Sequence, residues 1–289
     1  MSLTAAFPKK TTRIHEKNIT FGSNGFKLRG QILFPDDASK DEPVPGAVLC
    51  HGFGSSYRQV KPAARMLAQR GIATLIFDMR GHCSSEGIVD GKMTEDIFDA
   101  WQVLKDYPEV DKKRMGLAGH SMGAMSAIVA AERLQPKALA VLSSPPQLNH
   151  CMLFEVPDNF GRWGSQRSYI IEYPRGGAFP WLSGMAAWGS RAWMYIFGYT
   201  MRVDLRKFFT SVLQMNMKKV LADLKDCSKL FVFCTGDSIT PYEKFAPVYE
   251  ITSEPKELIL SKGGLHTTPI MRGQLCQEWV NWLAQELKK

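Results

Sequence analysis

The sequence has few cysteines, and they follow no recognisable pattern. Six occur among 289 residues, with no Cys-x-x-Cys pair and no histidine cluster nearby. This spacing argues against a dense disulfide framework and against a zinc site, and free thiols in a reducing compartment are the simpler interpretation. We therefore expect a cytoplasmic protein that needs no metal.

Long apolar runs that could export or anchor the chain are also scarce. Residues 1–13 are basic, but no apolar stretch of signal-peptide length follows them, so export by that route is not expected. Residues 178–201 are apolar and aromatic over a length that could cross a bilayer, but Arg191 and three glycines interrupt them. We expect no integral membrane span, because an anchor there would separate two halves of one predicted domain.

Acidic residues are outnumbered: 28 Asp and Glu stand against 36 Lys and Arg, which gives a net charge of +8. The most local basic cluster lies within residues 202–219 and contains no recognisable nucleic-acid-binding motif. The other basic residues are spread along the chain, which is typical of a solvated surface. We expect no nucleic-acid partner, and the sequence is compatible with a homodimer.

Strand-like and helix-like runs alternate over most of the chain, after an opening hairpin predicted around the turn at residues 22–25. This alternation predicts a doubly wound, mainly parallel sheet, with the carboxyl ends of its strands gathered at one edge. The predicted strands are 18–21, 27–34, 47–50, 72–78, 114–118, 138–142, 229–234 and 257–260, and the predicted helices are 59–69, 94–106, 124–133, 242–249 and 273–287.

The alternation stops between about residues 147 and 226. We predict that this segment is a mostly helical cap over the active edge, between a first core part (1–146) and a second core part (227–289). A packing layer with no substrate role is the alternative. The aromatic residues expected to line a substrate site from the cap are Trp163, Trp181, Trp188 and Trp193.

A Gly-x-Ser-x-Gly pentapeptide occupies residues 119–123, between a strand-like and a helix-like run. At a sharp strand-to-helix turn the central serine is strained and its hydroxyl is exposed, while the glycines avoid clashes. Ser121 is therefore a candidate nucleophile. The pattern alone is weak, since chance gives on the order of 0.1 matches in a chain of this length.

A serine hydroxyl needs a base and a third group that orients the base. Asp237 follows the strand predicted at 229–234, and His266 follows the next strand after two glycines. The chain order Ser121, Asp237, His266 is that of α/β-hydrolases and differs from the orders in chymotrypsin and subtilisin. Singly, Asp237 could be a turn residue and His266 an exposed loop histidine. Their order and common edge favour a catalytic triad.

An acyl-transfer site also needs donors for the oxyanion. We predict the backbone N–H groups of Phe53 and Met122, which lie in the loop after a central strand and directly after the nucleophile. His51 is expected to brace this loop. His120 is expected to pack beside the turn rather than do chemistry, and it is included with Phe53 among the residues of the substrate site.

Five segments together resemble the α/β-hydrolase superfamily. They are His51-Gly-Phe-Gly, Asp78-Met-Arg-Gly-His82, Gly119-His-Ser-Met-Gly123, Gly236-Asp237 and Gly264-Leu-His266. The chain is most similar to capped serine esterases, monoacylglycerol-lipase-like proteins and cinnamoyl or feruloyl esterases, a group often labelled serine aminopeptidase-like. Relatives often carry Gly-x-Gly-x-Ser after the Asp-x-Arg segment, whereas here His82 and Cys83 precede Ser84.

The resemblance implies an α/β-hydrolase fold with a cap and a cofactor-free serine hydrolase. We expect carboxylic esters with small to medium acyl or aryl groups as substrates. One alternative is an amide-cleaving, aminopeptidase-like enzyme, for which Glu155, Asp158 or Glu172 could hold a substrate ammonium. Another is a non-catalytic receptor that uses the pocket to sense a ligand.

Overall fold

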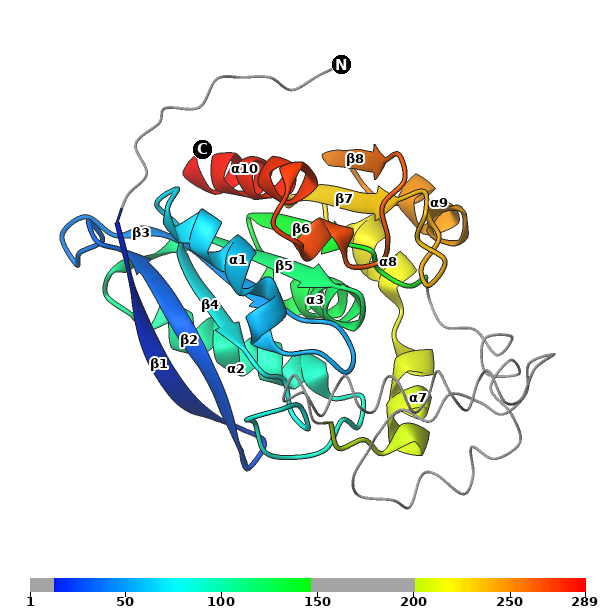
Figure 1. Cartoon of the computed structure of the whole chain (residues 1–289), viewed down its shortest axis with the longest axis horizontal. Coiled ribbons are helices and arrows are strands. Elements are labelled where there is room, and N and C mark those ends of the chain that lie inside the picture. The colour runs from blue at the N-terminus through cyan, green and yellow to red at the C-terminus, as the bar shows by residue number, and fades with distance from the viewer. Residues whose placement is uncertain (1–12, 147–200) are drawn as a thin grey trace.

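The computed structural model describes residues 13–146 and 201–289. Eight strands form one sheet in the order β1-β2-β4-β3-β5-β6-β7-β8 (Figure 1). Strands β1 and β2 form the antiparallel hairpin, β2 also pairs antiparallel with β4, and all later pairs are parallel. The strands are β1 (Ile14–Ser23), β2 (Phe26–Pro35), β3 (Val44–Cys50), β4 (Ala73–Phe77), β5 (Val110–His120), β6 (Ala138–Leu142), β7 (Ser228–Cys234) and β8 (Lys256–Ser261).

Helices cover both faces of this sheet, as the alternation predicts. One apolar cluster lies between the sheet and helices α1 and α10, and a second lies on the other face with α2, α3 and α8. The helices are α1 (Tyr57–Ala68), α2 (Met93–Lys105), α3 (Met122–Leu134), α7 (Leu205–Gln214), α8 (Met217–Asp223), α9 (Tyr242–Glu250) and α10 (Gln274–Lys288), with a 3₁₀ turn η1 (Thr268–Ile270). The α/β-hydrolase fold class is confirmed.

The central strands are mostly apolar along the lengths where neither face meets water. All five residues of β4 and of β6 are buried, and the last six residues of β5 are buried as well. The outer strand β8 keeps only partly buried and exposed residues. The consequence for function is a rigid parallel centre, whose carboxyl ends hold loops at fixed positions.

The predicted cap falls mostly outside the described residues, which resume at Met201. From Met201 the chain lies along the loop that follows β4. Isolated β-bridges join His82 to Met201 and Val89 to Val203. The Arg202 guanidinium donates to the carbonyl oxygen of Ser85 over 2.6 Å. Helices α7 and α8 then lead to β7. In the described ranges no helix is long and apolar enough to cross a membrane, and residues 178–200 lie outside them.

Candidate active site

Loops from the carboxyl ends of four parallel strands meet at one edge of the sheet. Phe53 follows β3, Ser121 follows β5, Asp237 follows β7 and His266 follows β8. Strands β3 and β5 are direct neighbours, as are β7 and β8, with β6 between the two pairs. The alternation of strands and helices dictates this convergence, because right-handed crossovers return every parallel strand in the same direction.

Ser121 stands at a strained turn between β5 and α3. Its φ is 55° and its ψ is −121°, a region that non-glycine residues rarely adopt. A Cβ added at Gly119 would fall on the backbone of Gly123, and one at Gly123 would fall on the carbonyl oxygens of Cys50 and His51. The two glycines are thus required by close backbone packing. The Ser121 N–H donates to Leu142 O over 2.9 Å, which fixes the turn to β6.

Asp237 and His266 form a direct pair, with 2.9 Å between Asp237 Oδ2 and His266 Nδ1. Asp237 Oδ1 accepts the backbone N–H groups of Ile239 at 2.9 Å and Thr240 at 3.0 Å. Burial raises the pKa of Asp237, but the hydrogen bonds from Thr240 and His266 outweigh it and hold the pKa below its usual value. The carboxylate is therefore ionised at neutral pH and can orient the imidazole.

His120 connects this pair to the serine turn. Its Nε2 donates to His266 O over 2.8 Å, and the two rings lie 4.7 Å apart between centroids. Burial, followed by the nearby His266, lowers the pKa of His120 to about 4, so its ring is neutral. His266 thus packs against the residue that directly precedes the candidate nucleophile Ser121.

The backbone N–H groups of Phe53 and Met122 are the predicted oxyanion donors. No acceptor within the described residues is bonded to either of them. Met122 begins α3, where the helix dipole adds positive potential. The peptide unit that carries the Phe53 N–H is fixed from its other end, because Gly52 O accepts the His51 Nδ1–H at 2.7 Å and the Ser55 N–H at 3.3 Å.

A family model described as serine aminopeptidase, S33, matches residues 41–164. The fold agrees with that of Est1E from Butyrivibrio proteoclasticus, solved with bound ferulic acid, at a TM-score of 0.66 and 19% identity over 94% of this chain and all of that one. The chain therefore has the α/β-hydrolase fold.

Two curated relatives that match part of this chain are described as thiohydrolases. The chain is 39% identical to thiohydrolase aneE of Aspergillus aculeatus over 114 residues, which are 37% of this chain and 34% of that protein. It is 36% identical to thiohydrolase apmlB of Arthrinium phaeospermum over 156 residues, which are 51% of this chain and 46% of that protein. The matches thus span about a third to a half of these relatives.

The other predicted site residues are distributed as follows. Phe53 is half-buried, and its ring packs 5.2 Å from that of Phe208 on α7. His120 is buried, and its part in substrate binding remains a prediction. Both ring nitrogens of His51 form hydrogen bonds with backbone groups: Nδ1 donates to Gly52 O, and Nε2 accepts the Met79 N–H. This is what we expect of a residue that braces the loop. The four tryptophans lie outside the described residues.

Sequence reasoning did not predict the contacts that support the loop between β4 and α2. The Asp78 carboxylate accepts the hydroxyl groups of Ser56 at 2.7 Å and Ser84 at 2.6 Å, so it joins the start of α1 to this loop. His82 accepts the Gly54 N–H at Nε2 over 3.2 Å. A polar residue directly after an apolar strand was the available signal for Asp78, whereas nothing local marked His82 as a partner of Gly54.

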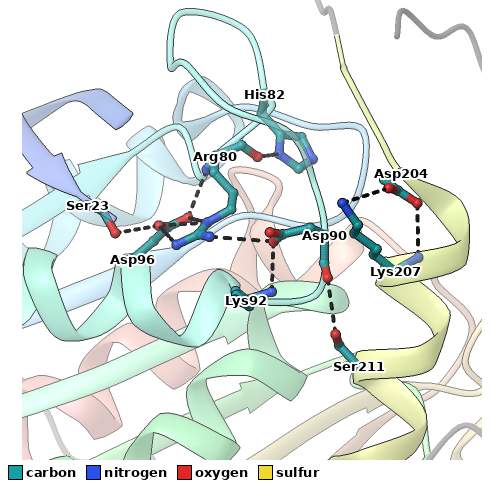
Figure 2. A network of polar contacts seen from close by, with 9 residues as sticks. All are labelled: Ser23, Arg80, His82, Asp90, Lys92, Asp96, Asp204, Lys207 and Ser211. Carbon is teal, nitrogen blue, oxygen red and sulfur yellow. Dashed lines mark hydrogen bonds and ion pairs between the residues drawn. The ribbon is translucent and has the colours of Figure 1, made fainter. Parts of the chain in front are cut away.

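Arg80 holds the same loop through a buried ion pair. Figure 2 shows its guanidinium between Asp96 and Asp90, with Ser23 donating to Asp96 from the hairpin. The Arg80–Asp96 distance is 2.7 Å and the Arg80–Asp90 distance is 3.5 Å. The Asp90 carbonyl accepts the Ser211 hydroxyl at 3.2 Å, which ties the loop to α7. Within the described part of the chain, no group of three or more His, Cys, Asp or Glu side chains could hold a metal ion.

Proposed function

We propose that this hydrolase cleaves carboxylic esters through an acyl intermediate on Ser121. The observation that carries the proposal is the Asp237–His266 pair at the same sheet edge as the strained Ser121 turn. Ester cleavage also agrees with the presence of esterases among proteins of the same fold. Substrates with small to medium acyl or aryl groups are favoured by the aromatic wall of Phe53 and Phe208.

The proposed reaction assigns a role to Ser121, to His266 and to the two backbone N–H groups. Ser121 Oγ attacks the ester carbonyl carbon while His266 Nε2 takes its proton, and the oxyanion accepts the N–H groups of Phe53 and Met122. The C–O bond to the leaving group then breaks, and the alcohol departs with the proton from His266. Water next gives a proton to His266 and attacks the acyl carbon. The bond between that carbon and Ser121 Oγ then breaks, and His266 returns the proton to Ser121 Oγ as the acid leaves.

The direct test uses purified protein with p-nitrophenyl esters of graded chain length and a fluorophosphonate probe. We expect turnover and a single covalent adduct on Ser121. Ser121→Ala should lose the adduct and several orders of magnitude in kcat, because the nucleophile is absent. Ser126→Ala is a matched control, since Ser126 is a buried serine on α3. Absence of turnover, or wild-type turnover in Ser121→Ala, would contradict the proposal.

Thioesters are the second candidate substrates, because two relatives at 36% and 39% identity are described as thiohydrolases. The same serine chemistry serves both, with a thiol rather than an alcohol as the leaving group. Matched ester and thioester pairs with one acyl chain would separate them by their kcat/KM values. The residues considered for an amide substrate, Glu155, Asp158 and Glu172, lie outside the described residues, and an intact Asp–His pair gives no support to a non-catalytic receptor.

We also propose that residues 147–226 form a cap between core parts 1–146 and 227–289, and that the protein is a cytoplasmic homodimer. Helices α7 and α8, which follow the undescribed part, support the helical character of the cap. Limited proteolysis would be expected to cut at the cap boundaries first. Light scattering would be expected to give twice the chain mass of 32.4 kDa.

A further inference from the structure

Thr240 lies within hydrogen-bond distance of both members of the Asp–His pair. Its Oγ1 is 2.8 Å from Asp237 Oδ2, 3.1 Å from His266 Nδ1 and 3.0 Å from the carbonyl oxygen of Ser143. Thr240 is buried, with 3% of its surface exposed. Since Asp237 Oδ2 and His266 Nδ1 are 2.9 Å apart, the three atoms form a nearly equilateral triangle.

The single hydroxyl proton of Thr240 decides what this triangle can do. Asp237 Oδ2 and Ser143 O are both acceptors, so the proton must be donated to one of them. Towards His266 the hydroxyl oxygen can then only accept. Both neighbours of His266 Nδ1 are therefore acceptors, and the ring proton is held on Nδ1. This leaves Nε2 unprotonated, which is the form that a general base for Ser121 needs.

We propose that Thr240 is a positioning residue, which fixes the tautomer and orientation of His266 through a second acceptor beside Asp237. This role rests on the proposed function, in which His266 is the base. The hydroxyl also joins the loop after β7 to the end of β6, because Ser143 follows β6 directly. It thus couples the position of the Asp–His pair to the strand that lies next to the Ser121 turn.

Other ionisable side chains lie near the Asp–His pair. A pH dependence reports on the pair only if the protonation states of these side chains do not change in the same pH range. His120 lies against His266 from the end of β5, with His51 beyond it, and Cys234 lies below Gly264. Burial raises the pKa of Cys234 and lowers that of His51, so both side chains are neutral near pH 7. Changes in rate between pH 5 and 8 that depend on Thr240 consequently report on the Asp–His pair.

The test compares Thr240→Val, which keeps the shape and removes the hydroxyl, with Thr240→Ser, which keeps the hydroxyl. For Thr240→Val we expect kcat to fall on the order of tenfold with little change in KM. In a plot of rate against pH, the acidic side of the curve should also be shifted relative to wild type. Thr240→Ser should stay close to wild type. Thermal unfolding of both variants checks that the fold persists.

A measurement that needs no turnover separates this inference from the proposed function. Nitrogen-15 correlation spectra of the imidazole give the tautomer of His266, with His266→Gln for assignment. We expect the Nδ1–H form in wild type and Thr240→Ser, and a mixture in Thr240→Val. An unchanged tautomer in Thr240→Val, or equal loss of it in Thr240→Ser, would overturn the role of Thr240. Absence of ester and thioester turnover in wild type would overturn only the proposed function.

Discussion

His51 Nδ1 donates a hydrogen bond to the carbonyl oxygen of Gly52 over 2.7 Å. That carbonyl and the N–H of Phe53 belong to one trans peptide unit, so they point in opposite directions. His51 Nε2 meanwhile accepts the Met79 N–H at 3.0 Å, which fixes the ring itself. A buried histidine thus helps to fix the direction of the Phe53 N–H.

Replacing His51 should lower kcat with little effect on KM. In His51→Leu the Gly52 carbonyl loses its strongest donor, so the Phe53 N–H is no longer held in place. Loss of an oxyanion donor costs about 10²- to 10³-fold in kcat, and a misdirected donor should cost roughly ten- to a hundredfold. Steady-state kinetics on a p-nitrophenyl ester measures this. His51→Asn, which can still donate to Gly52 O, should recover part of the rate; equal losses in both variants would contradict the argument.

Buried neutral histidines should make the fold sensitive to mild acid. Burial lowers the pKa of His120 to about 4 and that of His82 to about 3, whereas in the unfolded chain both titrate near 6.5. Between these values the unfolded state binds more protons, so the free energy of unfolding falls as the pH drops. From pH 6.5 to 5 the expected loss is about 3 kcal/mol for the two groups together.

Urea unfolding at a series of pH values measures this loss. His120→Gln should reduce this loss by about 1.5 kcal/mol, the share of His120, because Gln can still donate to His266 O but does not titrate. His15→Gln is the control, since His15 is exposed at the start of β1 and should leave the slope unchanged. A pH-independent free energy of unfolding between pH 5 and 7 would be inconsistent with neutral buried rings.

The fold could be predicted almost completely from the sequence because its signals are local. The continuous apolar runs at β3, β4 and β6 and the turn residues at 22–25 define strands without reference to the rest of the chain. The triad candidates followed from the same information, since parallel strands place their carboxyl ends together. Boundaries moved by only a few residues, mainly at β5, which begins at Val110 rather than near residue 114.

The supporting contacts could not be predicted, because they join residues that are far apart in the chain. Thr240 meets Ser143 across 97 residues, and His82 meets Gly54 across 28. Neither residue stands out by type: a threonine in a loop is ordinary, and His82 was noted as part of a motif and not as a partner of Gly54. Cys83 does adopt a positive φ of 40°, which explains why glycine would suit that position.

The buried ion pair between Arg80 and Asp96 should be essential for stability. Removal of one partner leaves an uncompensated charge in the interior, which costs about 3–5 kcal/mol. We expect this loss in the free energy of unfolding for Arg80→Met and Asp96→Asn, measured by urea unfolding. The double variant Arg80→Met/Asp96→Leu should be more stable than either single one. Lys219→Met, which breaks the exposed contacts with Asp223 and Glu132, should change stability little.

The glycine after the nucleophile should tolerate no side chain at all. A Cβ at Gly123 would meet the carbonyl oxygens of Cys50 and His51, which are backbone atoms at the end of the central strand β3 and directly after it, so they cannot rotate away as a side chain could. Gly123→Ala should therefore displace α3 from β3 and separate the Met122 N–H from the Phe53 N–H. We expect a lowered melting temperature and loss of nearly all ester turnover. Gly22→Ala meets nothing within 4 Å and should behave as wild type. Full activity in Gly123→Ala would show that the turn can relax without disturbing the oxyanion donors, which the packing of β3 against α3 forbids.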